Sequence, residues 1–219
     1  MSGSRPMRLA LIAAACSTTL CTLFHAPAAH AQATPVCTTE TVGSEEFFGI
    51  SGSSDNNVIG VGDNGIIYRN NGSGWAPMTS PTSRDLNDVE VVNATTAFAV
   101  GDNGTILQLV GTNWIEHTGV TGRAMYGVWA ASATEAYVVG DRGEIWIFNG
   151  ITWTDASGPA GTDNRDLEDV WGDANNVYAM SDRGELYIYN RTTGTWAPRE
   201  DACRQGNNFE DLWGDGAGN

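Results

Sequence analysis

The chain has 219 residues, and its 26 acidic and 11 basic residues give a formal net charge of −15 at pH 7. All the basic residues are arginines, and removal of two of them with the signal peptide described below would bring the charge to −17. So acidic a surface disfavours binding to nucleic acid or to an anionic membrane. It is compatible with a cationic partner or simply with a well-solvated exterior.

The first 31 residues are predicted to be a cleaved signal peptide. Arg5 and Arg8 form a basic start, residues 9–23 are apolar or small, and Ala29-His30-Ala31 fits a signal peptidase site. The apolar stretch is too short to span a membrane, so no transmembrane segment is predicted. We therefore expect cleavage after Ala31 and a secreted, periplasmic or cell-envelope protein.

One stretch of the chain, residues 61–75 (VGDNGIIYRNNGSGW), is written four times. It returns at 100–114, 139–153 and 180–196. The spacings between the equivalent aspartates are 39, 39 and 41 residues; these are Asp63, Asp102, Asp141 and Asp182. A fixed period of this length indicates a repeat architecture.

Each repeat carries the pattern of four short strands. An apolar run leads into Asp-x-Gly, whose aspartate accepts turn hydrogen bonds and whose glycine supplies the positive φ of a tight hairpin. A further strand precedes the hairpin, and a tryptophan opens a fourth strand after it. Four antiparallel strands in about 40 residues make one blade of a β-propeller, so we predict an all-β propeller. The 27 glycines disfavour a helical fold.

The predicted blades follow a short N-terminal segment, 32–46. They cover about 47–84, 85–123, 124–165 and 166–208, and residues 209–219 repeat only the first strand of a fifth unit. An open ring would expose a strand edge, so we expect a truncated chain whose native form has further blades. A four-bladed ring with a C-terminal tail is the alternative. The predicted inter-blade core includes Ile67, Leu107, Ile145 and Leu186.

Cys37 and Cys203 are the cysteines that remain after the signal peptide. Export permits a disulfide, and these two residues are its candidates. Pairing of Cys203 or Cys37 with a cysteine beyond residue 219 is the other possibility. A lipoprotein site at Cys16 or Cys21 has a poor sequence context.

Three arginines are the first candidate binding residues: Arg84, Arg123 and Arg165 each stand just before the first strand of a repeat. Equivalent positions of a propeller lie on one rim, so their guanidinium groups could together hold a carboxylate or phosphate. The alternative is that each pairs with a nearby acid, for example Arg84 with Asp88 and Arg165 with Asp169.

Tryptophans in the first strand are the second candidates. Trp129 and Trp171, with Trp213 in the partial repeat, occupy one position of the pattern. Stacked aromatic rings can bind sugars, although a large aromatic at a fixed repeat position also serves to pack neighbouring blades.

No metal or cofactor site is predicted. His117 is the only histidine after residue 31, and it has no partners spaced as zinc ligands. Calcium binding by an aspartate-rich loop such as 173–176 is conceivable, but the 12-residue calcium-loop pattern is missing. Nucleotide-binding and serine-nucleophile motifs are missing too.

The Asp-x-Gly segments, such as 63–68, resemble the Asp box of bacterial neuraminidase repeats, although Val61 and its equivalents replace the usual Ser or Thr. The whole pattern over 47–219 is closer to exported bacterial repeat proteins and to photosystem II assembly-factor-like propellers. This resemblance implies architecture rather than activity, because Asp boxes are structural turns.

The predicted function is therefore an exported binding or scaffolding module, not an enzyme, with an unknown protein or glycan partner. The alternative is a sialidase-like glycan-active enzyme. That chemistry would require a Tyr–Glu pair and an acidic Asp beside the three arginines.

Overall fold

The computed structural model describes residues 44–157 and 165–199, the single residues Val42, Leu212 and Gly214, and the backbone of two short strands. These strands, β1 (Leu20–Cys21) and β2 (Thr39–Glu40), pair with each other. Over the described ranges, no helix has the length and apolar character needed to cross a membrane.

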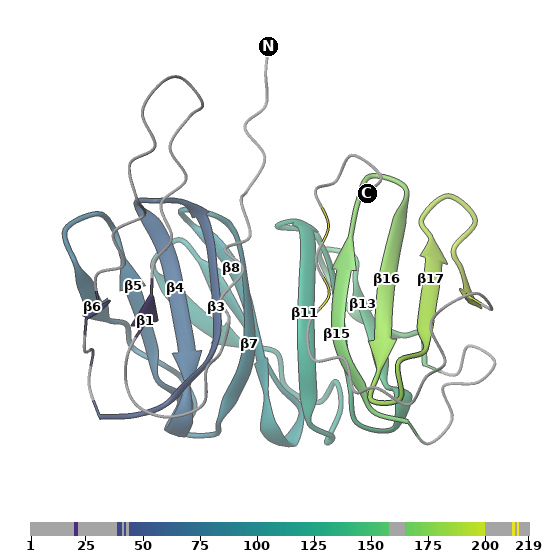
Figure 1. Ribbon diagram of the computed structural model, residues 1–219, viewed down its shortest axis with the longest axis horizontal. Helices are drawn as coiled ribbons and strands as arrows, with labels where there is room; N and C mark the ends of the chain where they lie inside the picture. Colours follow the sequence, from purple (N-terminus) through teal and green to yellow (C-terminus); the bar gives the residue numbers. More distant parts are fainter. Residues whose placement is uncertain are drawn as a thin grey trace, which may run out of the picture.

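The remaining strands form four antiparallel sheets of four strands each, and every sheet takes its strands consecutively from the sequence (Figure 1). The first contains β3 (Phe47–Ser54), β4 (Asn57–Gly62), β5 (Ile67–Asn70) and β6 (Trp75–Pro77). The second contains β7 (Leu86–Asn93), β8 (Thr96–Gly101), β9 (Thr105–Val110) and β10 (Asn113–Glu116). The third contains β11 (Met125–Ser132), β12 (Glu135–Gly140), β13 (Ile145–Phe148) and β14 (Trp153–Asp155). The fourth contains β15 (Leu167–Gly172), β16 (Asn176–Ser181), β17 (Leu186–Asn190) and β18 (Thr195–Pro198).

The first strands of the sheets, β3, β7, β11 and β15, contact one another in series. The sheets are thus the blades of a β-propeller and these are its inner strands, which confirms the predicted all-β class and the four-stranded blades. We number the blades 1 to 4 in chain order.

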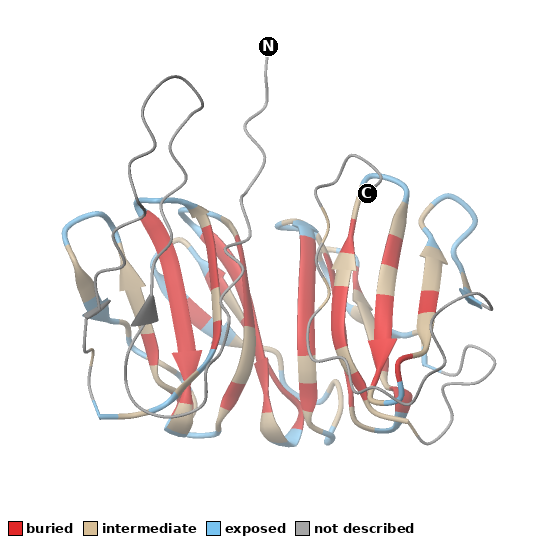
Figure 2. Ribbon diagram, in the orientation of Figure 1, coloured by how far each residue is buried: buried red, intermediate tan, exposed pale blue. Residues whose placement is uncertain are grey.

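The core lies between neighbouring blades. Three apolar clusters fill the interfaces of blades 1 and 2, 2 and 3, and 3 and 4, and the buried segments run along the middle of the strands (Figure 2). Ile67, Leu107 and Ile145 are buried as predicted. Leu186 is only half-buried, because its position in the repeat faces the next blade, and after blade 4 the described residues include only Leu212 and Gly214. Tyr187, which faces blade 3, is buried instead.

The Asp-x-Gly segments form the predicted tight hairpins between the second and third strand of each blade. In blades 1 to 3 they are assigned as short 3-10 turns: η1 (Asp63–Gly65), η2 (Asp102–Gly104) and η3 (Asp141–Gly143). Their two central residues both have positive φ, for example Asn64 at 56° and Gly65 at 73°. This is the type I′ arrangement, which matches the right-handed twist of the flanking strands.

The fourth turn differs from the other three. Ser181 replaces the glycine that precedes the aspartate, and within this turn only Gly184 has a positive φ. The Ser181 hydroxyl accepts hydrogen bonds from the backbone N–H groups of Arg183 (3.3 Å) and Glu185 (3.1 Å). In blade 4 the turn is therefore stabilised by the Ser181 side chain, whereas in blades 1 to 3 it is formed by two residues with positive φ.

Candidate functional site

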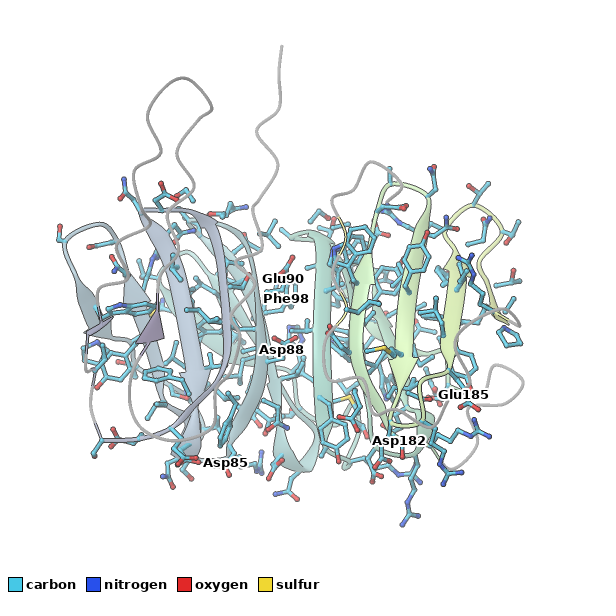
Figure 3. All side chains as sticks on the ribbon, viewed as in Figure 1. Asp85, Asp88, Glu90, Phe98, Asp182 and Glu185 are labelled. Carbon is cyan, nitrogen blue, oxygen red and sulfur yellow. The ribbon has the colours of Figure 1, made fainter. Side chains whose placement is uncertain are left out.

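The two ends of the propeller differ in chemistry. One end of the propeller carries the four Asp turns and the residues just before the inner strands, and we call this end the Asp-turn rim. The opposite end, with the turns that join the first to the second and the third to the fourth strand of each blade, is the Asn-turn rim. Figure 3 places the labelled Asp85, Asp182 and Glu185 at the Asp-turn rim.

The three predicted arginines all lie on the Asp-turn rim, and each forms an ion pair with a glutamate of the blade whose inner strand it precedes. Arg84 contacts Glu116 at 2.9 Å and Arg123 contacts a glutamate carboxylate at 3.5 Å. Arg165 pairs with Glu185. The partner of Arg123 is Glu144, which like Glu185 stands three residues after the aspartate of its turn. The structure thus places equivalent arginines on one rim, with their charges already engaged.

Asp88 and Asp169, the alternative partners considered for Arg84 and Arg165, accept backbone hydrogen bonds. One oxygen of Asp88 accepts the N–H of Val89 at 2.7 Å, and the other accepts the N–H of Val128 in blade 3 at 2.9 Å. Asp169 does the same for Val170 and Leu212, both at 2.7 Å. Asp88 thus ties the inner strands β7 and β11 together, and Asp169 ties β15 to Leu212.

Trp129 and Trp171 pack between blades. Trp129 is 8% exposed, and a Cβ added to Gly172 of blade 4 would lie 2.6 Å from its ring. A Cβ on Gly214 would lie 2.7 Å from the ring of Trp171. Gly172 and Gly214 thus each make room for the tryptophan that stands one repeat earlier in the chain.

Several predicted sites fall elsewhere. Trp213, Cys37 and Cys203 lie outside the described residues, so the disulfide stays a prediction. His117 contacts Gln108 Oε1 through Nε2 at 3.0 Å, and burial lowers the pKa of His117. Within the part of the chain that the structure describes, no three His, Cys, Asp or Glu side chains are grouped to hold a metal ion.

A Tyr–Glu pair does exist, but at the other end of the molecule. The Tyr137 hydroxyl donates to Glu135 at 2.9 Å, and Glu135 pairs with Ser132, the last residue of β11. Arg123 precedes the first residue of β11, roughly 20 Å away at the usual rise per strand residue. Burial and the Glu135 hydrogen bond raise the pKa of Tyr137, which opposes a nucleophilic role. This hydrogen-bonded Tyr–Glu pair therefore does not lie beside the three arginines.

A repeated irregularity marks the Asp-turn rim more clearly than the arginines do. The pairing of each inner strand with its neighbour shifts register after its first residue, so that the second residue is the extra residue of a β-bulge. These bulge residues are Phe48, Asn87, Tyr126 and Glu168. A bulge re-aims a side chain, and bulges are frequent beside binding sites. Four equivalent positions thus present four different side chains, from an exposed aromatic ring to a carboxylate.

Adjacent bulge positions lie close to each other. The side-chain amide of Asn87 donates to the carbonyl of Met125 at 2.9 Å, one residue before Tyr126. It also lies 3.4 Å from Asp102 of the second Asp turn.

The bulges could not be predicted from the alternation of apolar and polar residues in the sequence. One inserted residue changes which face of the sheet the following side chains point to.

Carboxylates of three blades act on the hydroxyl group of Tyr126. Burial raises the pKa of Tyr126 first, and the charges of Asp166, Asp141, Glu168 and Asp102 raise it further. All four charges that shift this pKa are carboxylates, contributed by the Asp turns of blades 2 and 3 and by the start of blade 4.

Simultaneous replacement of Arg84, Arg123 and Arg165 by alanine tests the predicted anion site. If the three guanidinium groups together hold a carboxylate, a glutamate-rich decapeptide should bind the natural chain and lose about tenfold or more in affinity for the variant. Isothermal titration would measure this, with Arg183→Ala, another exposed arginine of the rim, as control. Equal affinity for both variants would remove the arginines from the site.

No protein-family model matches the chain, and no curated protein matches its sequence. Among solved structures, it is similar to YCF48 bound to D1 peptide, with a TM-score of 0.55 and 12% identity over 74% of this chain and 56% of that one. It is also similar to YCF48 from Cyanidioschyzon merolae, with a TM-score of 0.51 and 18% identity over 70% of this chain and 56% of that one. The chain thus spans about half the length of these structures. The likeness shows the fold, a β-propeller of the architecture found in photosystem II assembly factors.

Proposed function

We propose that the chain is a binding module that holds a protein or peptide partner on its Asp-turn rim, with the bulge residues at the centre of the contact surface. The observation that carries the proposal is the bulge itself. It recurs at the start of β3, β7, β11 and β15, yet each blade places a different side chain on it. A fixed backbone with variable side chains is how a rigid scaffold presents a recognition surface.

Two further observations support binding rather than catalysis. The hydrogen-bonded Tyr137–Glu135 pair lies at the end of the propeller opposite the three arginines, and Glu135 is held by Arg191 of the neighbouring blade. One of the similar propellers, YCF48, is described with a bound peptide, so this architecture can serve peptide recognition. The signal-peptide pattern of residues 1–31 supports a location outside the cytoplasm for the proposed module.

The test is selection of random displayed decapeptides on the natural chain, followed by affinity measurements on two double variants. Phe48→Ser with Tyr126→Ser removes two aromatic bulge residues. Val110→Ser with Ile151→Ser removes two exposed apolar side chains of the Asn-turn rim and is the matched control. Selected peptides should lose about tenfold or more in affinity for the bulge variant, because aromatic anchors dominate contact energies, and about twofold or less for the control.

Thermal unfolding would establish that both variants keep the native fold. Peptides that bind the bulge variant as well as the natural chain would contradict the proposal, and so would peptides whose binding depends on Val110 and Ile151.

A further inference from the structure

The outermost strand of each blade, β6, β10, β14 or β18, is the last strand of its sheet. One of its edges pairs with the third strand of the blade, and the other edge pairs with no described strand. An unpaired strand edge offers backbone N–H and C=O groups to another chain, and proteins commonly protect such edges with proline, with charge or by keeping the strand short. The four outer strands differ in this protection.

In blade 2 the backbone groups that point to the free edge belong to Trp114 and Glu116. The N–H of His117 donates to the carbonyl of Ile106 at 2.9 Å, so these two residues form a hydrogen-bonded pair at the end of the β9–β10 ladder. Hydrogen-bonded and non-hydrogen-bonded pairs alternate along an antiparallel ladder. Ile115 therefore directs its N–H and C=O to β9, whereas those of Trp114 and Glu116 point outward.

The other blades protect the position of Glu116, which stands two residues after the tryptophan of the outer strand. Blades 1 and 4 have Pro77 and Pro198 there. Proline has no N–H, so neither residue can donate a hydrogen bond to an added strand. Blade 3 has Asp155 at this position, at the end of a strand of only three residues. The four-residue strand β10 contains no proline.

The side chain between the two outward-pointing residues of β10 is apolar and exposed. Ile115 is 50% exposed, whereas the equivalent positions of the other blades hold alanine or threonine. The acid beside it, Glu116, pairs with Arg84 at 2.9 Å. Thus β10 combines two outward N–H groups with an exposed β-branched side chain, and such an edge is suited to receive a further strand.

We propose that β10 is a self-association site, to which β10 of a second copy of this chain adds in the antiparallel direction. The occupant is a second copy because the edge is complementary to itself. A two-fold axis through Ile115 places Trp114 of each copy opposite Glu116 of the other, and their outward N–H and C=O groups form the hydrogen-bonded pairs. The two Ile115 side chains then meet in the intervening non-hydrogen-bonded pair, where cross-strand side chains are closest. No acid stands opposite another acid in this register.

Sedimentation equilibrium of the natural chain tests the proposal. Strand pairing buries a small interface, so we expect a monomer–dimer equilibrium between about 1 and 200 μM. Ile115→Lys places a charge at the centre of the edge, and Glu116→Pro gives β10 the residue that protects blades 1 and 4. Each variant should raise the dimer Kd at least about tenfold.

Each edge variant has a matched control. Thr154→Lys adds the same charge at the equivalent position of β14, and Glu116→Gln removes the carboxylate but keeps the N–H group. Both controls should change the dimer Kd by about twofold or less. The bulge variant Phe48→Ser with Tyr126→Ser should dimerise like the natural chain, because the binding surface proposed above belongs to the inner strands.

Circular dichroism would establish that every variant keeps the native fold. A natural chain that stays monomeric over the whole concentration range would overturn the proposal. So would a dimer that Ile115→Lys and Glu116→Pro weaken no more than their controls do, since the copies would then meet through another surface. Neither result bears on peptide binding at the Asp-turn rim, which the displayed peptides test separately.

Discussion

Replacement of Gly101 by alanine is expected to lower the free energy of unfolding by about 3 to 5 kcal/mol, a large part of the stability of a domain of this size. A Cβ on this residue would lie 2.0 Å from the carbonyl oxygen of Asp85 and 2.9 Å from the Cα of Leu86. Both are backbone atoms of the same blade and cannot move aside like the end of a side chain. The adjacent hydrogen bond from the N–H of Asp102 to that carbonyl, 3.0 Å long, would be lost as well.

Gly122→Ala is the matched control, because a Cβ there meets no atom within 4 Å. Urea unfolding of both variants, followed by circular dichroism, measures the difference. Blade 4 carries Ser181 at the equivalent position, in a hairpin of different conformation. If Gly101→Ala were no less stable than Gly122→Ala, the close approach of the Asp turn to the inner strand would be wrong.

Arg191→Ala is expected to destabilise the chain by about 2 to 4 kcal/mol by opening the interface of blades 3 and 4. Its Nε and Nη2 donate to the two oxygens of Glu135 at 3.0 and 2.7 Å. Its Nη1 donates to the carbonyls of Asp173 (2.7 Å) and Ala174 (3.0 Å). The guanidinium also lies 5.6 Å from the centre of the Trp129 ring. With only 20% of the side chain exposed, these contacts are partly shielded from water.

Arg191→Lys separates charge from geometry, since an ammonium group keeps the charge but cannot make both bonds of the fork. We expect it to recover less than half of the loss. Arg183→Ala removes a guanidinium that is 64% exposed and 3.9 Å from Asp182, and should change the stability by about 0.5 kcal/mol or less. Full stability of Arg191→Lys in chemical unfolding would show that the bidentate pair does not hold the blades together.

The Asp turns show how far local sequence reaches. An Asn-Gly pair can adopt two consecutive positive φ angles at little cost, so Asn64-Gly65 predicts its own hairpin. Arg142 adopts the same conformation, with a φ of 55°, although an arginine has no intrinsic preference for it. Its backbone N–H is held by Asp166 of the next blade, 24 residues away. The tertiary contact there imposes what the local sequence does not favour.

The three arginines show how much of the candidate site could be predicted from the sequence. Their placement on one rim follows from the repeat period and was predictable, since Arg84, Arg123 and Arg165 occupy equivalent positions. The glutamates that pair with these arginines could not be predicted, because an ion pair depends on which side chains the hairpins return to the rim. Glu144 and Glu185 stand about 20 residues from the arginines they contact, whereas the nearby Asp88 and Asp169 face the neighbouring inner strand.

The amino-acid sequence was enough to predict the repeat, the strand order within each blade and the turns, because period, hydrophobic alternation and glycine placement act over short distances along the chain. It also placed Ile67, Leu107 and Ile145 in the core. The half-burial of Leu186, the ion pairs of the rim and the bulges at Phe48 and Tyr126 could be learned from the folded structure alone. Each of these depends on packing between elements distant in the sequence, where a shift of one residue in strand pairing changes which side chain meets the solvent.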